Sequence, residues 1–231
     1  DLSYLLDAHP NCAGNKPLLR IEIRPALYEA PTPNGTLLGA ASTYYYNYTN
    51  GSQMQTGYAY GNVWRTLNGG EDNTSMPYLI GTNTYHGYMY FNFHSSITWN
   101  TAMDPNFSNG AAGKDFYQVV LHETCHMLGI HSWIDSDGTS RVSNPASDPN
   151  GLYTAYDKFL IKQSPPNTAV LHNTDGCHAV QFNTTTNLLT GGCDQINFKG
   201  TQTPTLSLPA YTPTVWADGS SLSHFGNDPC N

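Results

Sequence analysis

Two histidines and a glutamate stand at a spacing that suits metal chemistry: His122, Glu123 and His126 form the sequence His-Glu-x-x-His. On a helix, residues four apart lie on one face about a turn apart, so both imidazoles can reach one ion. Glu123 is rotated to the side, where its carboxylate can reach a water on the metal without becoming a ligand. Zinc lowers the pKa of a bound water toward roughly 7, so Glu123 would accept its proton and later donate it to a leaving amine. The pattern therefore predicts one catalytic zinc ion and the hydrolysis of peptide bonds.

The same three residues could instead be polar groups of an ordinary helix. A chain with 9 histidines forms this pattern by chance at a frequency of roughly 0.6%. Burial of two histidines and a glutamate on a central helix also costs several kcal/mol when they have no partners. The metal interpretation is therefore favoured.

The segment that must position these residues is the best helix candidate in the chain. Residues 114–128 contain neither Gly nor Pro, Asp115 suits the N-terminus, and Gly129 suits the helix end because it tolerates the left-handed conformation. Apolar residues occur on nearly all sides of this segment, which predicts a central, buried helix.

A resemblance to a known family rests on three segments. The sequence H-E-T-C-H-M-L-G at 122–129 resembles the metzincin pattern, which continues to a third histidine at position 132, where this chain has Ser132. Leishmanolysin-like metzincins separate the glycine from the third histidine by a long insertion. Secreted bacterial relatives of that branch are similar to this chain at D-F-Y-Q-V-V-L-H-E-T-C-H-M-L-G (115–129), Y-D-K-F-L (156–160) and G-S-S-L-S-H (219–224).

The resemblance implies that His224 is the third zinc ligand beside His122 and His126, with Glu123 as the catalytic residue. A catalytic zinc ion needs three protein ligands and an open position. The alternatives for the third ligand are His131 first, and then His172 and His178.

One departure from metzincins concerns the methionine turn that lies beneath the zinc. All five methionines of this chain precede His224. Either such a turn follows beyond residue 231, or another segment forms the floor of the site.

The hydrophobic patterns predict an α+β fold with a central helix and a loop-rich C-terminal subdomain. The resemblance implies that this fold is of metzincin type, with a mixed sheet and the active site on the central helix. We expect one catalytic domain over 1–231, with subdomains 1–130 and 131–231. Strands are predicted at 18–24, 43–48, 85–94, 179–182 and 195–198, helices at 55–67 and 152–162, and loops at 100–113 and 201–213. The substrate would lie along 85–94 as an edge strand.

Composition narrows the class of partner. Of the 231 residues 39% are hydrophobic, enough for a core, only 11% are charged, and the net charge is −8. No basic stripe suits nucleic acid, and no apolar run is long enough to span a membrane. The chain begins at Asp1 with no leader segment, which suits either a mature form whose leader has been removed or a cytosolic protein. We expect a secreted monomer that acts on proteins or peptides.

The cysteines support an extracellular setting. Cys12, Cys177, Cys193 and Cys230 lie in Gly-, Asn- or Pro-rich segments, where disulfide bonds are common. Our preferred pairing is Cys177 with Cys193 and Cys12 with Cys230, although four cysteines allow three pairings. Cys125, inside the helix motif, is expected to be a buried free thiol.

Calcium is a second candidate cofactor. The sequence Asp135-Ser136-Asp137-Gly138 resembles the start of a calcium loop. The rest of the ligand pattern is missing, and the alternative interpretation is an ordinary turn.

Two other functions compete with the peptidase. A catalytically silent binding or adhesion module could keep zinc for stability, but such a site would not need Glu123. A zinc hydrolase of a non-peptide bond would use the same metal chemistry, and a panel of substrates would distinguish it.

Overall fold

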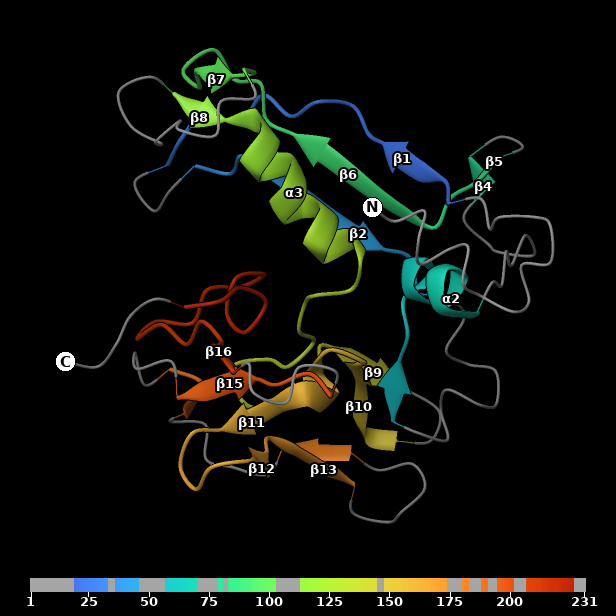
Figure 1. Cartoon of the computed structure of the whole chain (residues 1–231), viewed down its shortest axis with the longest axis vertical. Coiled ribbons are helices and arrows are strands. Elements are labelled where there is room, and N and C mark those ends of the chain that lie inside the picture. Colours follow the sequence, from blue (N-terminus) through green and yellow to red (C-terminus); the bar gives the residue numbers. More distant parts are fainter. Residues whose placement is uncertain are drawn as a thin grey trace. The chain divides into compact units, whose positions relative to one another are not determined.

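The computed structural model describes residues 19–32, 36–45, 57–69, 79–80, 83–102, 113–144, 148–173, 180–182, 188–190, 195–201 and 207–226. The chain divides into two compact units. Unit 1 comprises Asp1–Tyr46 and Gly61–Gly129, and unit 2 comprises Asn47–Tyr60 and Ile130–Asn231. The described residues form a mixed α+β structure with mostly strands and few helices (Figure 1).

Unit 1 is built on a three-stranded sheet in the order β1-β6-β2. The central strand β6 (Gly87–Phe91) is parallel to β1 (Ile21–Ile23) and antiparallel to β2 (Gly39–Thr43). Met89 and Phe91 are buried while Tyr88 and Tyr90 are half-buried, which confirms the alternation predicted for 85–94 over β6. Beyond β6 it is wrong, because Asn92 is buried and Phe93 is 42% exposed. Because β6 has partners on both sides, the prediction that it is an edge strand that binds the substrate is wrong.

Helix α3 (Phe116–Met127) lies across this sheet, mainly against β2 (Figure 1). Its Met127 is buried together with Met89 and Phe91 from β6 and Val63 from helix α2 (Asn62–Gly69). Phe116 packs against Phe91 with a ring-centroid distance of 5.0 Å. This apolar cluster fixes α3 on the sheet, and it thereby fixes the residues that the helix carries.

The prediction that α3 is buried on nearly all sides is wrong. Only Glu123 and Met127 of this helix are buried. Tyr117 and Leu121, one turn apart, are 46% and 49% exposed. The apolar stripe that faces the sheet is narrower than the composition of the helix indicates.

Three further predictions in unit 1 need correction. The strand predicted at 43–48 overlaps β2 only at Thr43, where β2 ends, and 46–48 lie outside the described residues. The helix predicted at 55–67 begins only at Asn62, after the short strand β3 (Tyr58–Ala59) of unit 2. The predicted strand 18–24 is β1, but Ile23, expected on the same face as Leu19 and Ile21, is 64% exposed.

Two short strand pairs complete the described part of this unit: β4 (Leu79–Ile80) with β5 (Asn83–Thr84), and β7 (Trp99–Asn100) with β8 (Lys114–Asp115).

Unit 2 contains short strands around its own core. Its sheets have the orders β3-β10-β9 and β12-β11-β15-β16, and β13 pairs with β14. These strands are β9 (Val142–Asn144), β10 (Asp148–Thr154), β11 (Leu160–Lys162), β12 (Thr168–Ala169), β13 (Leu171–Asn173), β14 (Val180–Phe182), β15 (Ile196–Phe198) and β16 (Leu208–Pro209). The strands predicted at 179–182 and 195–198 are therefore confirmed in position.

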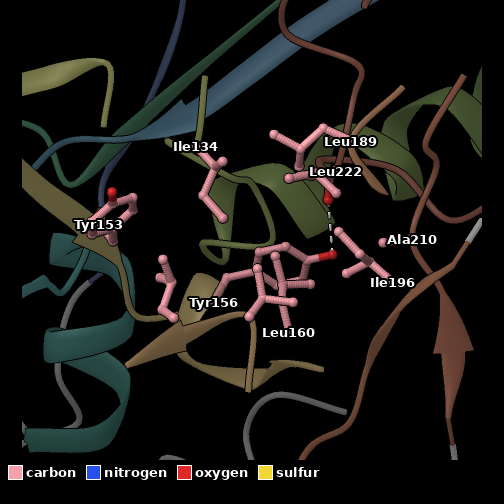
Figure 2. Close-up of a cluster of buried hydrophobic side chains, with 10 residues drawn as sticks. Ile134, Tyr153, Tyr156, Leu160, Leu189, Ile196, Ala210 and Leu222 are labelled. Atoms are coloured by element: carbon pink, nitrogen blue, oxygen red, sulfur yellow. Dashed lines mark hydrogen bonds between the residues drawn. The ribbon is translucent and has the colours of Figure 1, made fainter. Parts of the chain in front are cut away.

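The core of unit 2 includes Ile134, Tyr153, Tyr156, Leu160 and Leu222 (Figure 2). The helix predicted at 152–162 is wrong. This segment consists of the end of β10, a 3-10 turn at Asp157–Phe159 and β11. The Asp157 carboxylate accepts a hydrogen bond from the backbone N–H of Thr154 at 2.9 Å, which turns the chain between the strands. Tyr156 and Leu160 are nevertheless buried, as predicted.

The cysteines can be compared with the predictions only at one position. Cys125 is free, as predicted, but it is exposed and not buried. Cys12, Cys177, Cys193 and Cys230, with their predicted disulfide bonds, lie outside the described residues. None of the helices in the described part of the chain has the length and apolar character needed to cross a bilayer.

Candidate metal centre

The site begins with a helix whose two ends are well defined. Asp115 is the N-cap, and its Oδ1 accepts hydrogen bonds from the backbone N–H groups of Tyr117 at 2.9 Å and Gln118 at 3.3 Å. These bonds satisfy amides that have no partner inside the helix. The helix ends at Leu128, and Gly129 takes a φ of 99°, which favours glycine. The helix predicted from the sequence is confirmed, with its ends within two residues of those expected.

His122 and His126 lie one turn apart on α3 and point toward the same place. Their Nε2 atoms are 3.1 Å apart, and their rings are nearly perpendicular, at 88°. Two nitrogens that bind one zinc ion at tetrahedral geometry would be about 3.3 Å apart. The pair is therefore arranged much as two ligands of one ion would be. His122 is exposed and His126 is half-buried.

His224 belongs to a tight loop of unit 2. Its Nδ1 lies 3.0 Å from the carbonyl oxygen of Ser220. A carbonyl oxygen can only accept, so Nδ1 carries the proton and Nε2 keeps a lone pair for a metal. Histidine ligands of zinc are commonly fixed in this way by a backbone carbonyl.

The three histidines form a group that could hold a metal ion. His122 and His126 come from unit 1 and His224 comes from unit 2. In the part of the chain that the structure describes, no other group of three or more His, Cys, Asp or Glu side chains could hold an ion. Three imidazoles form a donor set that suits zinc.

Glu123 lies on a different side of α3 and is held by β2. The side chain is only 4% exposed, and burial raises the pKa of its carboxyl to about 7, while a hydrogen bond from the backbone N–H of Ala41 opposes the shift. A Cβ at Gly39 would lie 3.3 Å from Cγ of Glu123, so the strand approaches the glutamate closely. The buried Oε2 atom makes no hydrogen bond within the described residues. This carboxylate is therefore suited to exchange a proton with a bound molecule.

The first alternative for the third ligand, His131, is not part of the histidine group. It is half-buried, and its carbonyl oxygen accepts a hydrogen bond from the Thr154 hydroxyl at 2.8 Å. Ser132, which occupies the place of the third histidine in the contiguous metzincin pattern, is buried. Its backbone N–H donates to Oγ of Ser223 at 3.1 Å, so it supports the loop that carries His224.

The remaining described histidines have other positions. His86 is buried and its Nδ1 accepts a hydrogen bond from the Arg20 backbone, whereas His94 contacts Ser96. His172 is exposed on β13, and His178 lies outside the described residues. None of the described ones belongs to the group that could hold a metal.

The segment considered for calcium forms a tight turn. The backbone N–H of Gly138 donates to the carbonyl of Asp135 at 2.9 Å. The carboxylate of Asp137 accepts hydrogen bonds from both the backbone and the hydroxyl of Thr139. The carboxylates of this turn thus stabilise the turn itself, which agrees with the alternative interpretation of an ordinary turn.

Three residues of the site were not identified from the sequence: Gly39, Ala41 and Ser220. Gly39 and Ala41 support Glu123 from a strand about 80 residues away, and no sequence pattern marks that contact. Ser220 lies in the G-S-S-L-S-H segment that suggested His224, so a signal for it was present.

No family model, no curated protein and no solved structure matches this chain. Helix α3, which packs against a mixed sheet, carries two of the three histidines that could hold a metal ion, and His224 of unit 2 is the third.

Proposed function

We propose that this protein is a zinc-dependent endopeptidase of metzincin type, in which His122, His126 and His224 hold the metal. The observation that supports this best is a buried glutamate, Glu123, next to the first ligand on the same helix. A site that used zinc only for stability would have no need of a carboxylate with a raised pKa at this position. The leishmanolysin-like motifs support the same assignment.

Each residue has a distinct task in the proposed reaction. A bound zinc ion would supply Lewis acidity, which polarises the scissile carbonyl and makes a water acidic near neutral pH. Glu123 takes the proton from the attacking water and delivers it to the nitrogen of the leaving amine. Burial in the metal-free protein raises the pKa of this carboxyl to about 7, so the group takes up a proton more readily than an exposed glutamate does.

We further propose that the protein acts outside the cell as a monomer on proteins or peptides. The support is compositional. The chain carries a net charge of −8 with no basic stripe, and four of its cysteines lie in segments typical of disulfide bonds.

The decisive experiment compares the wild type with Glu123→Gln on an unfolded protein such as casein, and measures the zinc content of both. Gln keeps the size of the side chain but cannot take up the proton. We expect cleavage to fall by about 10²- to 10⁴-fold while one zinc ion per chain is retained. Glu29→Gln, at an exposed position, is the matched control and should cleave as the wild type does.

Three results would contradict the proposal. If the wild type binds zinc but does not cleave casein, the function is a silent binding module or the hydrolysis of another bond, which a panel of esters and amides would separate. Equal cleavage by Glu123→Gln would remove the assigned role of the glutamate. A wild type that binds no zinc would refute the assignment altogether.

A further inference from the structure

The loop that carries His224 contains a backbone conformation that needs support. Leu222, two residues before His224, has a φ of 61°, a left-handed conformation that residues with a Cβ rarely adopt. Such a conformation persists only where the surroundings hold it, and it often marks a functional site. Leu222 is fully buried in the core of unit 2 (Figure 2).

Hydrogen bonds fix both polar groups of the Leu222 backbone. Its N–H donates to the carbonyl of Tyr211 at 2.8 Å. Its carbonyl accepts a bond of 3.0 Å from the hydroxyl of Tyr156, drawn as a dashed line in Figure 2. The N–H of Tyr211 in turn donates to the carbonyl of His224 at 2.9 Å. The peptide groups on both sides of the turn therefore have fixed directions.

Ser223 provides a second side-chain contact to the same loop. It is buried, and its Oγ accepts the backbone N–H of Ser132 at 3.1 Å. The imidazole of His224 is oriented by the carbonyl of Ser220. Tyr156 and Ser223 thus hold the loop at the two residues that immediately precede His224.

The side chain of Tyr156 is itself fixed in the core of unit 2, so the position of its hydroxyl beside the Leu222 carbonyl is well defined. Its ring stacks on that of Phe198 with a centroid distance of 5.0 Å and an interplanar angle of 7°. Burial, together with the nearby Asp157, raises the pKa of its phenol above the ordinary range, so the hydroxyl remains a donor. Tyr156 belongs to the Y-D-K-F-L segment (156–160), and no residue of this segment has a task in the proposed reaction.

We propose that Tyr156 and Ser223 are positioning residues for His224, and that they hold the strained Leu222 turn so that Nε2 of His224 is directed toward the metal. This inference rests on the proposed function, because it takes His224 as a zinc ligand. Removal of either contact would let the turn relax and would misdirect the third ligand. Mutation of a residue that holds a zinc ligand in place typically weakens metal affinity by about 10- to 100-fold.

The test compares Tyr156→Phe with Tyr153→Phe. Tyr153 is also buried in the core of unit 2, and its hydroxyl also donates to a backbone carbonyl, that of Gly138 at 2.9 Å. Each substitution removes one oxygen and one buried hydrogen bond, so the loss of stability should be similar. The hydroxyl of Tyr156 donates to the loop of His224, whereas the hydroxyl of Tyr153 donates to the turn at Gly138.

Zinc affinity is measured by competition with a chromophoric chelator on the full chain, and unfolding is followed by urea titration of the metal-free protein. We expect Tyr156→Phe to weaken zinc binding about tenfold, while Tyr153→Phe stays within about twofold of the wild type. Of the two tyrosine variants, only Tyr156→Phe should change the visible spectrum of the cobalt-substituted protein. Ser223→Ala is the second variant, and it should weaken zinc binding in the same direction.

The outcomes separate the two proposals. A strong loss of zinc affinity in His224→Ala would support His224 as a ligand and leave the proposed function standing. If, in the same experiment, Tyr156→Phe and Ser223→Ala bind zinc as tightly as Tyr153→Phe does, the positioning role is refuted. If the wild type binds no zinc, or His224→Ala binds it as the wild type does, His224 is not a ligand and the positioning role fails with it.

Discussion

Nε2 of His122 and Nε2 of His126 lie 3.1 Å apart on one side of α3, while Glu123 between them in sequence is buried against β2. The same helix therefore places its imidazoles and its carboxyl group in different environments. The exposed side presents nitrogen ligands, and the buried side keeps a carboxyl group in surroundings that raise its pKa. The separation follows from the helical repeat, because neighbours in sequence differ in direction by about 100°.

The first prediction concerns the two histidines of α3. Replacement of His122 or His126 by Ala should weaken zinc binding by more than about a hundredfold, because a first ligand contributes more than an outer partner does. Equilibrium dialysis with zinc, followed by metal analysis, measures the effect. His94→Ala is the control, since His94 contacts Ser96 and lies outside the histidine group.

A wild-type affinity in both variants would contradict this prediction and would leave the motif without a metal function. Removal of zinc from the wild type by a chelator should abolish cleavage of casein, and added zinc should restore it. Activity that survives the chelator would contradict the metal assignment independently of any variant.

The second prediction tests the support of Glu123 by β2. A Cβ at Gly39 would lie 3.0 Å from the carbonyl of Tyr90 and 3.3 Å from Cγ of Glu123. We expect Gly39→Ala to displace the glutamate and to lower cleavage by about tenfold with zinc still bound, because small displacements of catalytic groups reduce rates strongly. The ratio of cleavage rate to zinc content is the quantity to measure.

Ala40→Ser is the matched control for Gly39→Ala. Successive residues of a strand point to opposite faces, so position 40 faces away from Glu123. Equal activity in Gly39→Ala and the control would show that β2 does not set the position of the carboxyl group.

The sequence predicts well what local chemistry determines. The N-cap at Asp115, the absence of Gly and Pro from 116 to 127 and the Gly129 stop are local signals, and α3 is found where they place it. The alternation in β6 is equally local, because Met89 and Phe91 must share a face. The pairing of His122 with His126 follows from the same helical geometry.

What depends on distant contacts was missed. The segment 152–162 has an apolar pattern that suits a helix, but Tyr153 and Thr154 pair with β3, and Asp157 turns the chain. The support of Glu123 by Gly39 is likewise a tertiary contact. His224 was assigned from a family resemblance and the need for a third ligand, since no local pattern connects it to a helix 95 residues earlier.

The third prediction concerns the start of helix α3. Asp115→Ala removes the acceptor for the amides of Tyr117 and Gln118 and should lower the free energy of unfolding by about 1 kcal/mol. Asp115→Asn keeps a side-chain oxygen and should retain most of the stability. Urea unfolding of the metal-free proteins measures both. A loss in Asp115→Asn as large as that in Asp115→Ala would show that the negative charge, rather than the capping oxygen, stabilises the helix.

The fourth prediction concerns the pH dependence of stability through Asp157. This carboxyl is fully buried, and desolvation raises its pKa to about 6 from an ordinary value of 3.8. Hydrogen bonds from the side chains of Ser132 and Thr154 and from the N–H groups of Trp133 and Thr154 oppose the shift. The folded protein thus binds the proton more tightly than the unfolded chain does. The free energy of unfolding must therefore fall as the pH rises from about 4 to about 6, and the contribution is about 3 kcal/mol.

Asp157→Asn tests this with little change of shape. Both backbone bonds go to Oδ2 of Asp157, and Oδ1 makes no hydrogen bond in the described structure, so an amide oxygen in the place of Oδ2 keeps both bonds. Asn cannot ionise, so the stability of the variant relative to the wild type should increase by about 3 kcal/mol between pH 4 and pH 7. Other titrating groups contribute equally to both proteins and cancel in the difference. Parallel pH profiles from urea unfolding would mean that Asp157 ionises in the folded protein as readily as in the unfolded chain, and the burial of the carboxyl would then have no effect on its proton affinity.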